Sequence, residues 1–147
     1  MKQWLDAAID RGAVPVLTGQ NGDMDTIGSA IALAAIHPSL LACGLHLGRI
    51  AKRLVEEMEA PFRKIAAHGT VFPDQLGGII IVDAAAPTQV GIDLPEVPRL
   101  IIDHHATNGW ELRDGDFMMQ WDVRATTEMV ATYMFQHAKE ALSSPVR

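Results

Sequence analysis

Four mainly apolar stretches divide the chain, and each has the length of a buried strand. They lie at 14–20, 40–48, 77–84 and 99–105. Runs of Val, Ile and Leu without polar alternation are typical of strands that are buried on both faces of a sheet. A shorter run at 116–121 indicates a fifth strand. The pattern therefore predicts a mostly parallel, five-stranded sheet.

Segments with helical spacing separate these strands. Apolar residues recur every three or four positions at 2–11, 25–36, 50–60 and 126–142, and the stretch 62–69 indicates a further helical turn. Strands that alternate with helices predict a doubly wound, Rossmann-like α/β domain with helices on both faces of the sheet. A chain of 147 residues is long enough for one such domain and too short for two, so we expect residues 1–147 to form a single domain.

Composition narrows the classes of function. The net charge of −6 argues against binding of long duplex nucleic acid, because such binding needs a basic face. The single cysteine, Cys43, excludes a disulfide framework, and a reducing cytoplasm fits best. The longest apolar stretch, 27–36, is too short to span a bilayer. These features predict a cytoplasmic protein that does not cross a membrane.

Acidic and imidazole side chains follow three of the predicted strands. Asp23 and Asp25 follow the first strand, Asp83 follows the third, and the fourth ends in Asp-His-His at 103–105. Because the carboxyl ends of parallel strands share one edge, we expect these side chains to meet in one crevice. Clustered carboxylates repel each other unless a cation neutralises them. Oxygen ligands with one or two imidazoles suit Mn²⁺ or Mg²⁺, and such sites support phosphoester hydrolysis.

Each of these residues also has an ordinary structural interpretation. An aspartate after a strand often forms a turn or caps a helix, and Asp25 could cap the helix that follows it. His104 could be a buried histidine with satisfied hydrogen bonds. Acids at three strand ends together favour the metal site over coincidence. The other four histidines lie outside the pattern and are interpreted as surface or structural residues: His37, His46, His68 and His137.

Taken in order, these segments resemble the motifs of the DHH phosphoesterase superfamily, which includes RecJ-like nucleases. The family's first motif, roughly H-x-N-P-D-x-D-x-x-G-S, is similar to "GQNGDMDTIGS" at 19–29. Its second is similar to "IIIVDAAAPTQVG" at 79–91, and its third is the Asp-His-His at 103–105. A helix start resembling A-S-S-T-A-E is loosely matched by "RATTEMV" at 124–130. The resemblance covers nearly the whole chain and implies the family's N-terminal, Rossmann-like domain.

The resemblance implies a set of metal ligands. Asp25, Asp83 and His104 would hold one ion of Mn²⁺ or Mg²⁺. Asp23 and Asp83 would hold a second ion, so that Asp83 bridges the two. Water activated at this site would then hydrolyse a phosphoester or phosphodiester.

The resemblance also implies residues for catalysis and substrate binding. His105 would face the substrate phosphate, and Asp103 would lie behind the ligands and orient an imidazole. Asn21, from the first motif, would contribute to substrate binding. The implied substrate is a small phosphorylated molecule, such as a nucleotide or a short oligonucleotide.

Two departures from the family pattern weaken the implied metal sites. The family's opening histidine falls on Gly19, which has no side chain. A further family aspartate, expected after the segment 124–130, has no counterpart before Arg147. We therefore expect two metal ligands and the smaller C-terminal substrate domain of the family to be missing.

Three interpretations stay open at this point. In the first, the chain is an active phosphoesterase with weakly bound metal, whose site a second copy in a homo-oligomer would complete. In the second, it is a degenerate domain that binds a nucleotide or a partner protein without turnover. In the third, it is the first domain of a longer phosphoesterase, in which residues 141–147 begin a linker.

Overall fold

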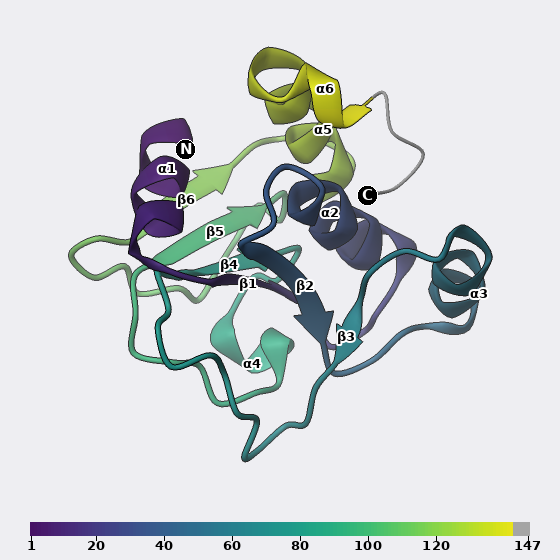
Figure 1. Cartoon of the computed structure of the whole chain (residues 1–147), viewed down its shortest axis with the longest axis horizontal. Helices are drawn as coiled ribbons and strands as arrows, with labels where there is room; N and C mark the ends of the chain where they lie inside the picture. The colour runs from purple at the N-terminus through teal and green to yellow at the C-terminus, as the bar shows by residue number, and fades with distance from the viewer. Residues whose placement is uncertain (143–147) are drawn as a thin grey trace.

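A single parallel sheet forms the centre of the protein. The computed structural model describes residues 1–142, so most of the predicted linker at 141–147 lies outside the described residues. The strands are β1 (Val14–Thr18), β2 (Leu40–Gly44), β3 (Arg63–Lys64), β4 (Ile79–Val82), β5 (Arg99–Asp103) and β6 (Phe117–Gln120). Their order is β3-β2-β1-β4-β5-β6, and every neighbouring pair is parallel (Figure 1). The predicted α/β architecture is confirmed, with six strands in place of five.

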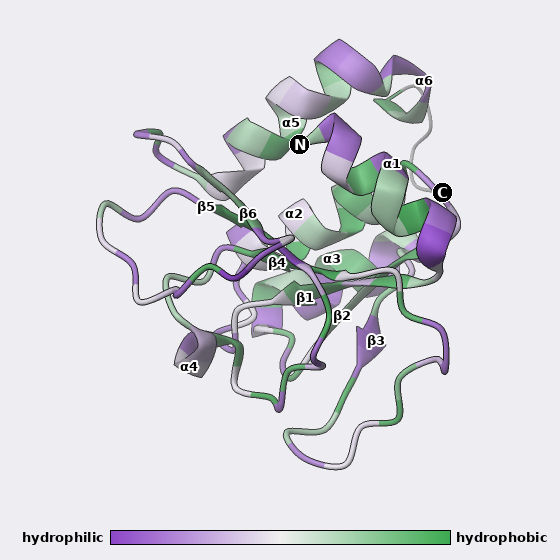
Figure 2. Ribbon diagram, turned by 90° about the vertical axis from the view of Figure 1, so that its left-hand side faces the viewer, coloured by the Kyte–Doolittle hydropathy of each residue, from purple (hydrophilic) through white to green (hydrophobic). Residues whose placement is uncertain are grey.

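The two faces of the sheet are covered differently. The helices are α1 (Lys2–Arg11), α2 (Met24–Ala34), α3 (Arg49–Met58), α4 (Pro87–Val90), α5 (Thr126–His137) and α6 (Lys139–Leu142). One face packs against α1, α2, α5 and α6. The short α4 and irregular segments cover the other face (Figure 2). Among residues 1–142, no helix combines the length and the apolar character needed to cross a membrane.

The prediction of a helical turn at 62–69 is wrong, because this segment contains the edge strand β3. Arg63 lies in register with Cys43 of β2, and the N–H of Ile65 donates to the carbonyl of Gly44 at 2.9 Å. Phe62 packs against the core on one face of the sheet and Ile65 against the core on the other. The open edge of β2 supplies hydrogen bonds that a single helical turn would lack.

One predicted helix is interrupted, and one short helix was not predicted. The last helix does not run unbroken from 126 to 142, because Ala138 leaves the helical conformation at φ −147° and ψ 43°. This break lets both Ala138 and Ala141 reach the core. The sequence pattern missed α4, although Pro87 at its start and Gly91 at its end, with φ 79°, are ordinary helix signals.

Cys43 points into the core on the face covered by α4, as its place in an apolar strand predicted. Its side chain is buried, and burial raises the pKa of the thiol to about 12. The thiolate is the reactive form, so we expect a thiol reagent to label the native protein at least roughly 100-fold more slowly than the urea-unfolded protein. Labelling of the native protein at the unfolded rate would contradict this packing.

Gly77 fixes the distance between α1 and the start of β4. A Cβ at this position would lie 1.7 Å from the carbonyl oxygen of Ala8, and Arg11 donates two hydrogen bonds to the Gly77 carbonyl at 3.0 and 2.9 Å. We expect Gly77→Ala to destabilise the fold by about 3 kcal/mol or more in urea unfolding. The matched control is Gly28→Ala in α2, where the nearest atom to a Cβ is 3.6 Å away. That substitution should stabilise the helix by up to about 1 kcal/mol. Equal effects of the two substitutions would contradict the close packing of α1 against Gly77.

Candidate metal centre

A cavity of about 550 Å³ lies at the carboxyl ends of β1 and β4. The chain leaves β1 toward β2 on one side and leaves β4 toward β5 on the other, so this is the switch point at which doubly wound sheets bind ligands. Eleven residues line it: Gly19, Gln20, Asn21, Asp23, Asp25, Asp83, Gln89, His104, His105, Arg124 and Ala125. Every site residue predicted from the sequence is among them except Asp103.

Asp83 occupies the centre of this edge, directly after β4. Its backbone is left-handed, with φ 59°, a conformation that Asp and Asn tolerate better than most residues. Trp110 supports the following turn through a 2.9 Å bond from its Nε1–H to the carbonyl of Ala84. Burial, followed by the negative charges of Asp25 and Asp23, raises the pKa of Asp83 to about 7. This carboxylate therefore lacks a compensating positive charge in the protein alone.

Asp23 begins α2 as its N-cap. One carboxylate oxygen accepts the N–H of Thr26 at 3.0 Å, and the other accepts the side-chain amide of Asn21 at 3.0 Å. Asn21, predicted to bind substrate, thus also orients Asp23. Asp23 is exposed, so its carboxylate remains accessible from the cavity.

Asp25 does not cap the helix that follows it; it caps α5, about a hundred residues later in the chain. It accepts the backbone N–H groups of Thr126 and Thr127 at 3.0 and 2.9 Å, and the Thr127 hydroxyl at 2.9 Å. Burial alone would raise the pKa of Asp25, but these hydrogen bonds outweigh it and lower the pKa. Its Oδ1 holds two of the three donors, so Oδ2 is the oxygen better placed to serve a cation.

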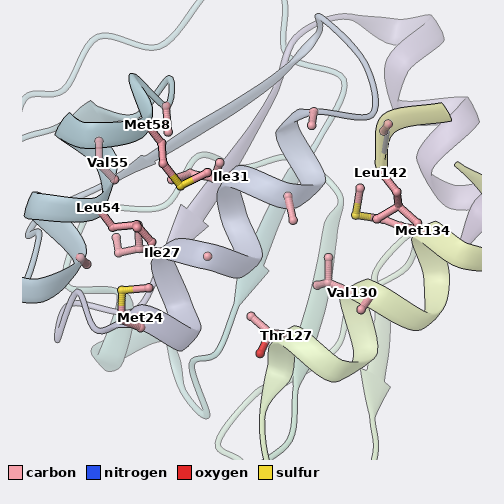
Figure 3. Close-up of a pocket in the computed structure, with 17 residues that line it drawn as sticks. Met24, Ile27, Ile31, Leu54, Val55, Met58, Thr127, Val130, Met134 and Leu142 are labelled. Carbon is pink, nitrogen blue, oxygen red and sulfur yellow. The ribbon is translucent and has the colours of Figure 1, made fainter. Parts of the chain in front are cut away.

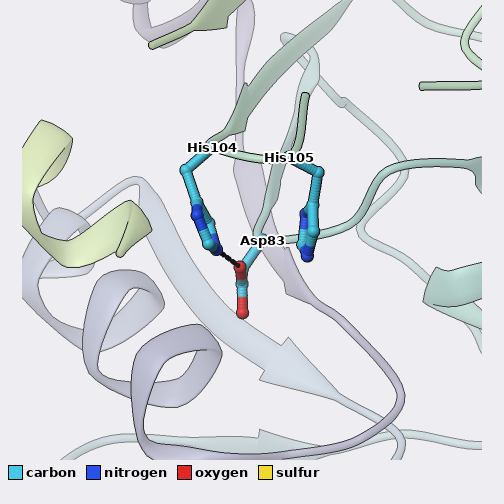
Figure 4. Close-up of side chains that lie close together, drawn as sticks. All are labelled: Asp83, His104 and His105. Carbon is cyan, nitrogen blue, oxygen red and sulfur yellow. Dashed lines mark ion pairs between the residues drawn. The ribbon is translucent and has the colours of Figure 1, made fainter. Parts of the chain in front are cut away.

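His104 is held in one tautomer. Its Nδ1 lies 3.2 Å from the carbonyl oxygen of Val123, and because a carbonyl only accepts, Nδ1 carries the proton. Its Nε2 then points at Asp83 Oδ1, 3.3 Å away, and lies 3.7 Å from Asp25 Oδ2 (Figure 4). Nε2 is then the ring nitrogen that faces both carboxylates, where a cation would be held between them. This is the usual arrangement of a metal-binding histidine.

His105 is paired with a buried acid. Its Nδ1 lies 2.6 Å from Oδ1 of Asp103, which is fully buried at the end of β5. This hydrogen bond raises the pKa of His105. The ring stands beside His104 with centroids 4.5 Å apart, and ligand atoms of Asp83, His104 and His105 all lie within 4.8 Å of one another (Figure 4). Asp103 thus lies behind the site and acts on it through His105.

The four histidines interpreted as structural do not line the cavity. His46, His68 and His137 are exposed, and His37 accepts the backbone N–H of Ser39. Three polar residues that the sequence interpretation missed do line it: Gln20, Gln89 and Arg124. Arg124 immediately precedes the "ATTE" segment, which is the one sequence signal that could have identified it.

Gly19 leaves little space for the family's first histidine. A Cβ there would lie 3.0 Å from the carbonyl oxygen of Asp83 and 3.3 Å from Oδ1 of Asn21. The N–H of Gly19 donates to the Thr26 hydroxyl at 2.8 Å, which holds this loop against α2. The loop is therefore packed around glycine, so a histidine at this position would require its neighbours to move.

Comparison with protein families agrees with this geometry. A family model described as the N-terminal domain of the DHH family matches residues 13–146. The chain belongs to the DHH family. A search of the curated proteins gave no significant match. The cavity at the ends of β1 and β4 thus lies within a DHH domain.

Two solved structures share the fold of this DHH domain. A candidate family II inorganic pyrophosphatase from Methanococcus jannaschii superposes with a TM-score of 0.62 at 22% identity, over 89% of this chain. An exopolyphosphatase-related protein from Bacteroides fragilis superposes with a TM-score of 0.56 at 14% identity, over 93% of this chain. The DHH domain spans 41% and 42% of the lengths of those two proteins.

Proposed function

We propose that this DHH domain binds divalent metal through Asp23, Asp25, Asp83 and His104 and hydrolyses a small phosphorylated substrate. The observation that supports it most strongly is the fixed His104 tautomer, whose Nε2 is directed at the buried Asp83. Burial of a carboxylate beside two others is costly without a cation. A cluster of oxygens and one imidazole fits Mn²⁺, with Mg²⁺ as the alternative.

The residues around the cluster would bind the substrate and move protons. A bound divalent ion would supply Lewis-acid stabilisation of the phosphoryl oxygens and activation of water. His105 would hold a proton at Nε2 for the leaving oxygen, because Asp103 accepts from its Nδ1 and favours the charged ring. Asn21 would keep Asp23 in place.

The substrate class is a small molecule with a phosphoanhydride or phosphoester bond. The cavity of about 550 Å³ is of the size that takes small ligands. The names of the two similar structures point to pyrophosphate and polyphosphate, which we place beside the nucleotides and short oligonucleotides expected from the sequence. Such substrates, and the single reduced cysteine, favour a cytoplasmic location.

Arg124 is proposed to contact a substrate phosphate. Within residues 1–142 its guanidinium makes no hydrogen bond or ion pair, although three carboxylates line the same cavity. We expect Arg124→Ala to raise KM roughly 10- to 100-fold, because a charged hydrogen bond to phosphate is lost. Metal stoichiometry should not change, and Arg124→Lys should recover part of the loss. An unchanged KM in steady-state assays would remove Arg124 from the site.

Hydrolysis of a small panel of substrates tests the proposed function, with phosphate release measured for the polyphosphates and mononucleotide formation measured for the dinucleotide. Pyrophosphate, tripolyphosphate and a dinucleotide are incubated with the protein and Mn²⁺, with and without chelator. At least one should be hydrolysed in a chelator-sensitive reaction that Asp83→Asn abolishes. Asp122→Asn is the matched control, since Asp122 is exposed and does not line the cavity. Equal turnover by both variants would assign the activity to a contaminant.

A second candidate is a binding domain without turnover. Two observations favour it: the loop is packed around Gly19, and Asp25 already accepts three hydrogen bonds from α5. In that case nucleotide or phosphate binding persists in chelator, and no substrate of the panel is hydrolysed at any metal concentration.

A further inference from the structure

The apolar face of α3 is largely uncovered. Ile50, Leu54 and Met58 follow one another at four-residue spacing and are 73%, 38% and 46% exposed. Only Ala51 of this helix is buried, and its nearest helical neighbour is α2. Helices of soluble proteins normally bury such a stripe against another element.

Leu54 and Met58 of this face, together with Ala51 and Val55, form one wall of a groove. α2 forms the floor, α5 the opposite wall, and α6 closes one end (Figure 3). The volume is about 480 Å³. The residues that define it are mostly aliphatic or methionine: Met24, Ile31, Leu54, Met58, Val130 and Met134. A groove of this kind fits the apolar face of a helix.

The charges of α3 are divided between its two ends. Arg49, Lys52 and Arg53 lie in its first half, and Glu56, Glu57 and Glu59 lie at its end. No acid lies in its first turn and no base in its last turn. This order is opposite to the one that the helix dipole favours, so it gives the isolated helix no advantage.

We propose that two copies of this chain associate through α3, with the two helices antiparallel across a two-fold axis. This arrangement places the basic half of each helix beside the acidic half of the other. The same surface is used by both copies, as a two-fold interface requires. The stripes of Ile50, Leu54 and Met58 on the two α3 helices then pack against each other beside the grooves, and the flexible Met24 and Met58 side chains adapt to the contact.

One pair of charges on α3 lies at the edge of the apolar stripe and defines the register. In the single chain Arg53 pairs with Glu57 of the same helix at 2.9 Å, with both side chains more than half exposed. Such a pair adds little to stability, so it can exchange for the equivalent pair between chains. In the antiparallel arrangement, Arg53 of each copy faces Glu57 of the other.

A second copy fits this surface better than a membrane does. Amphipathic helices that bind anionic lipid carry a predominantly basic polar face. The polar positions of α3 and its cap are balanced between three bases and three acids. The proposal does not depend on the proposed function. It does bring the second copy close to the metal centre, since Arg49 and Ile50 line a hollow shared with Asp23 and Asp25.

Sedimentation equilibrium tests the association. Between roughly 5 and 500 µM, the range suited to an interface smaller than standard size, the mass should rise from 16.0 kDa toward twice that value. Ile50→Glu should remain at the mass of one chain with unchanged thermal stability. If the unsubstituted protein has the mass of one chain at every concentration, the proposal is wrong. Another protein or a membrane would then be the partner that covers the groove.

A mixing experiment tests the antiparallel register. Arg53→Glu and Glu57→Arg should each weaken self-association roughly 10-fold, because like charges then face each other twice. A mixture of the two variants should recover the original association, since every facing pair becomes opposite in sign. Changes within one helix cannot produce this recovery.

The matched control is the equivalent pair on α1, where Lys2 and Asp6 are joined at 2.6 Å and are similarly exposed. Lys2→Glu and Asp6→Lys, alone or mixed, should leave the mass unchanged. A mixture of the α3 variants no heavier than either variant alone would overturn the antiparallel pairing.

Discussion

Asp83→Asn should abolish metal-dependent hydrolysis and, at the same time, stabilise the metal-free protein above about pH 7. Asparagine keeps the left-handed backbone at φ 59° and can still accept the Thr126 hydroxyl. It cannot offer the negative charge that a cation requires. Its amide can donate to a neighbouring carboxylate, so repulsion in the site is replaced by attraction.

The stability gain follows from the pKa of Asp83. The unfolded side chain has a pKa near 3.8, and the folded one has a pKa of about 7. Between these values the folded state retains a proton that the unfolded state has released, so stability falls as pH rises. The loss should be complete above about pH 7 and should reach at most about 4 kcal/mol. The Asn variant lacks this dependence.

Urea unfolding of both proteins across this pH range, in chelator, measures the difference. The two should have similar stability near pH 4 and diverge as pH rises, and Mn²⁺ should close the gap by stabilising only the unsubstituted protein. Parallel stability curves would show that Asp83 is not a strained, uncompensated carboxylate. An Asn variant that hydrolyses substrate would contradict the metal assignment.

His104→Ala and His105→Ala should separate metal binding from turnover. Removing His104 should lower Mn²⁺ affinity by at least roughly 10- to 100-fold, since its Nε2 faces Asp83 and Asp25. Removing His105 should leave that affinity within a few-fold and lower kcat by roughly 10²- to 10⁴-fold.

The pH profile carries a second test of His105. The bond to Asp103 raises the pKa of His105, so the charged ring persists above its usual range and activity should fall only when pH exceeds that raised value. In Asp103→Asn, the fall in activity at high pH should begin at a lower pH. A pH profile that does not change in Asp103→Asn would contradict the proposed role of His105. A larger loss of metal affinity in His105→Ala than in His104→Ala would mean that the two histidines have the opposite roles.

Strand ends were the most predictable part of the site. The apolar runs before Asp83 and Asp103 are continuous, and parallel pairing of β1, β4 and β5 brings their carboxyl ends together. The convergence of acids and imidazoles in one cavity follows from that topology alone. The DHH motifs, read in order, indicated the family that the match over residues 13–146 shows.

Contacts between distant segments were not predictable. Nothing in the local sequence shows that Asp25 caps α5 or that the carbonyl of Val123 fixes the tautomer of His104. The strand β3 depends on the open edge of β2, not on its own two residues. Arg124 was missed because a single arginine before a helix has no periodicity, and only the fold brings it to the cavity.

Isothermal titration of the metal-free protein with Mn²⁺ at about pH 6 is the most direct test of the metal centre. We expect saturable binding that Asp83→Asn abolishes, accompanied by release of a proton, because Asp83 is largely protonated below its pKa of about 7. Repeating the titration in buffers of different ionisation enthalpy measures that proton. No binding, or the same binding in the Asn variant, would contradict the proposal that this cavity is a metal centre.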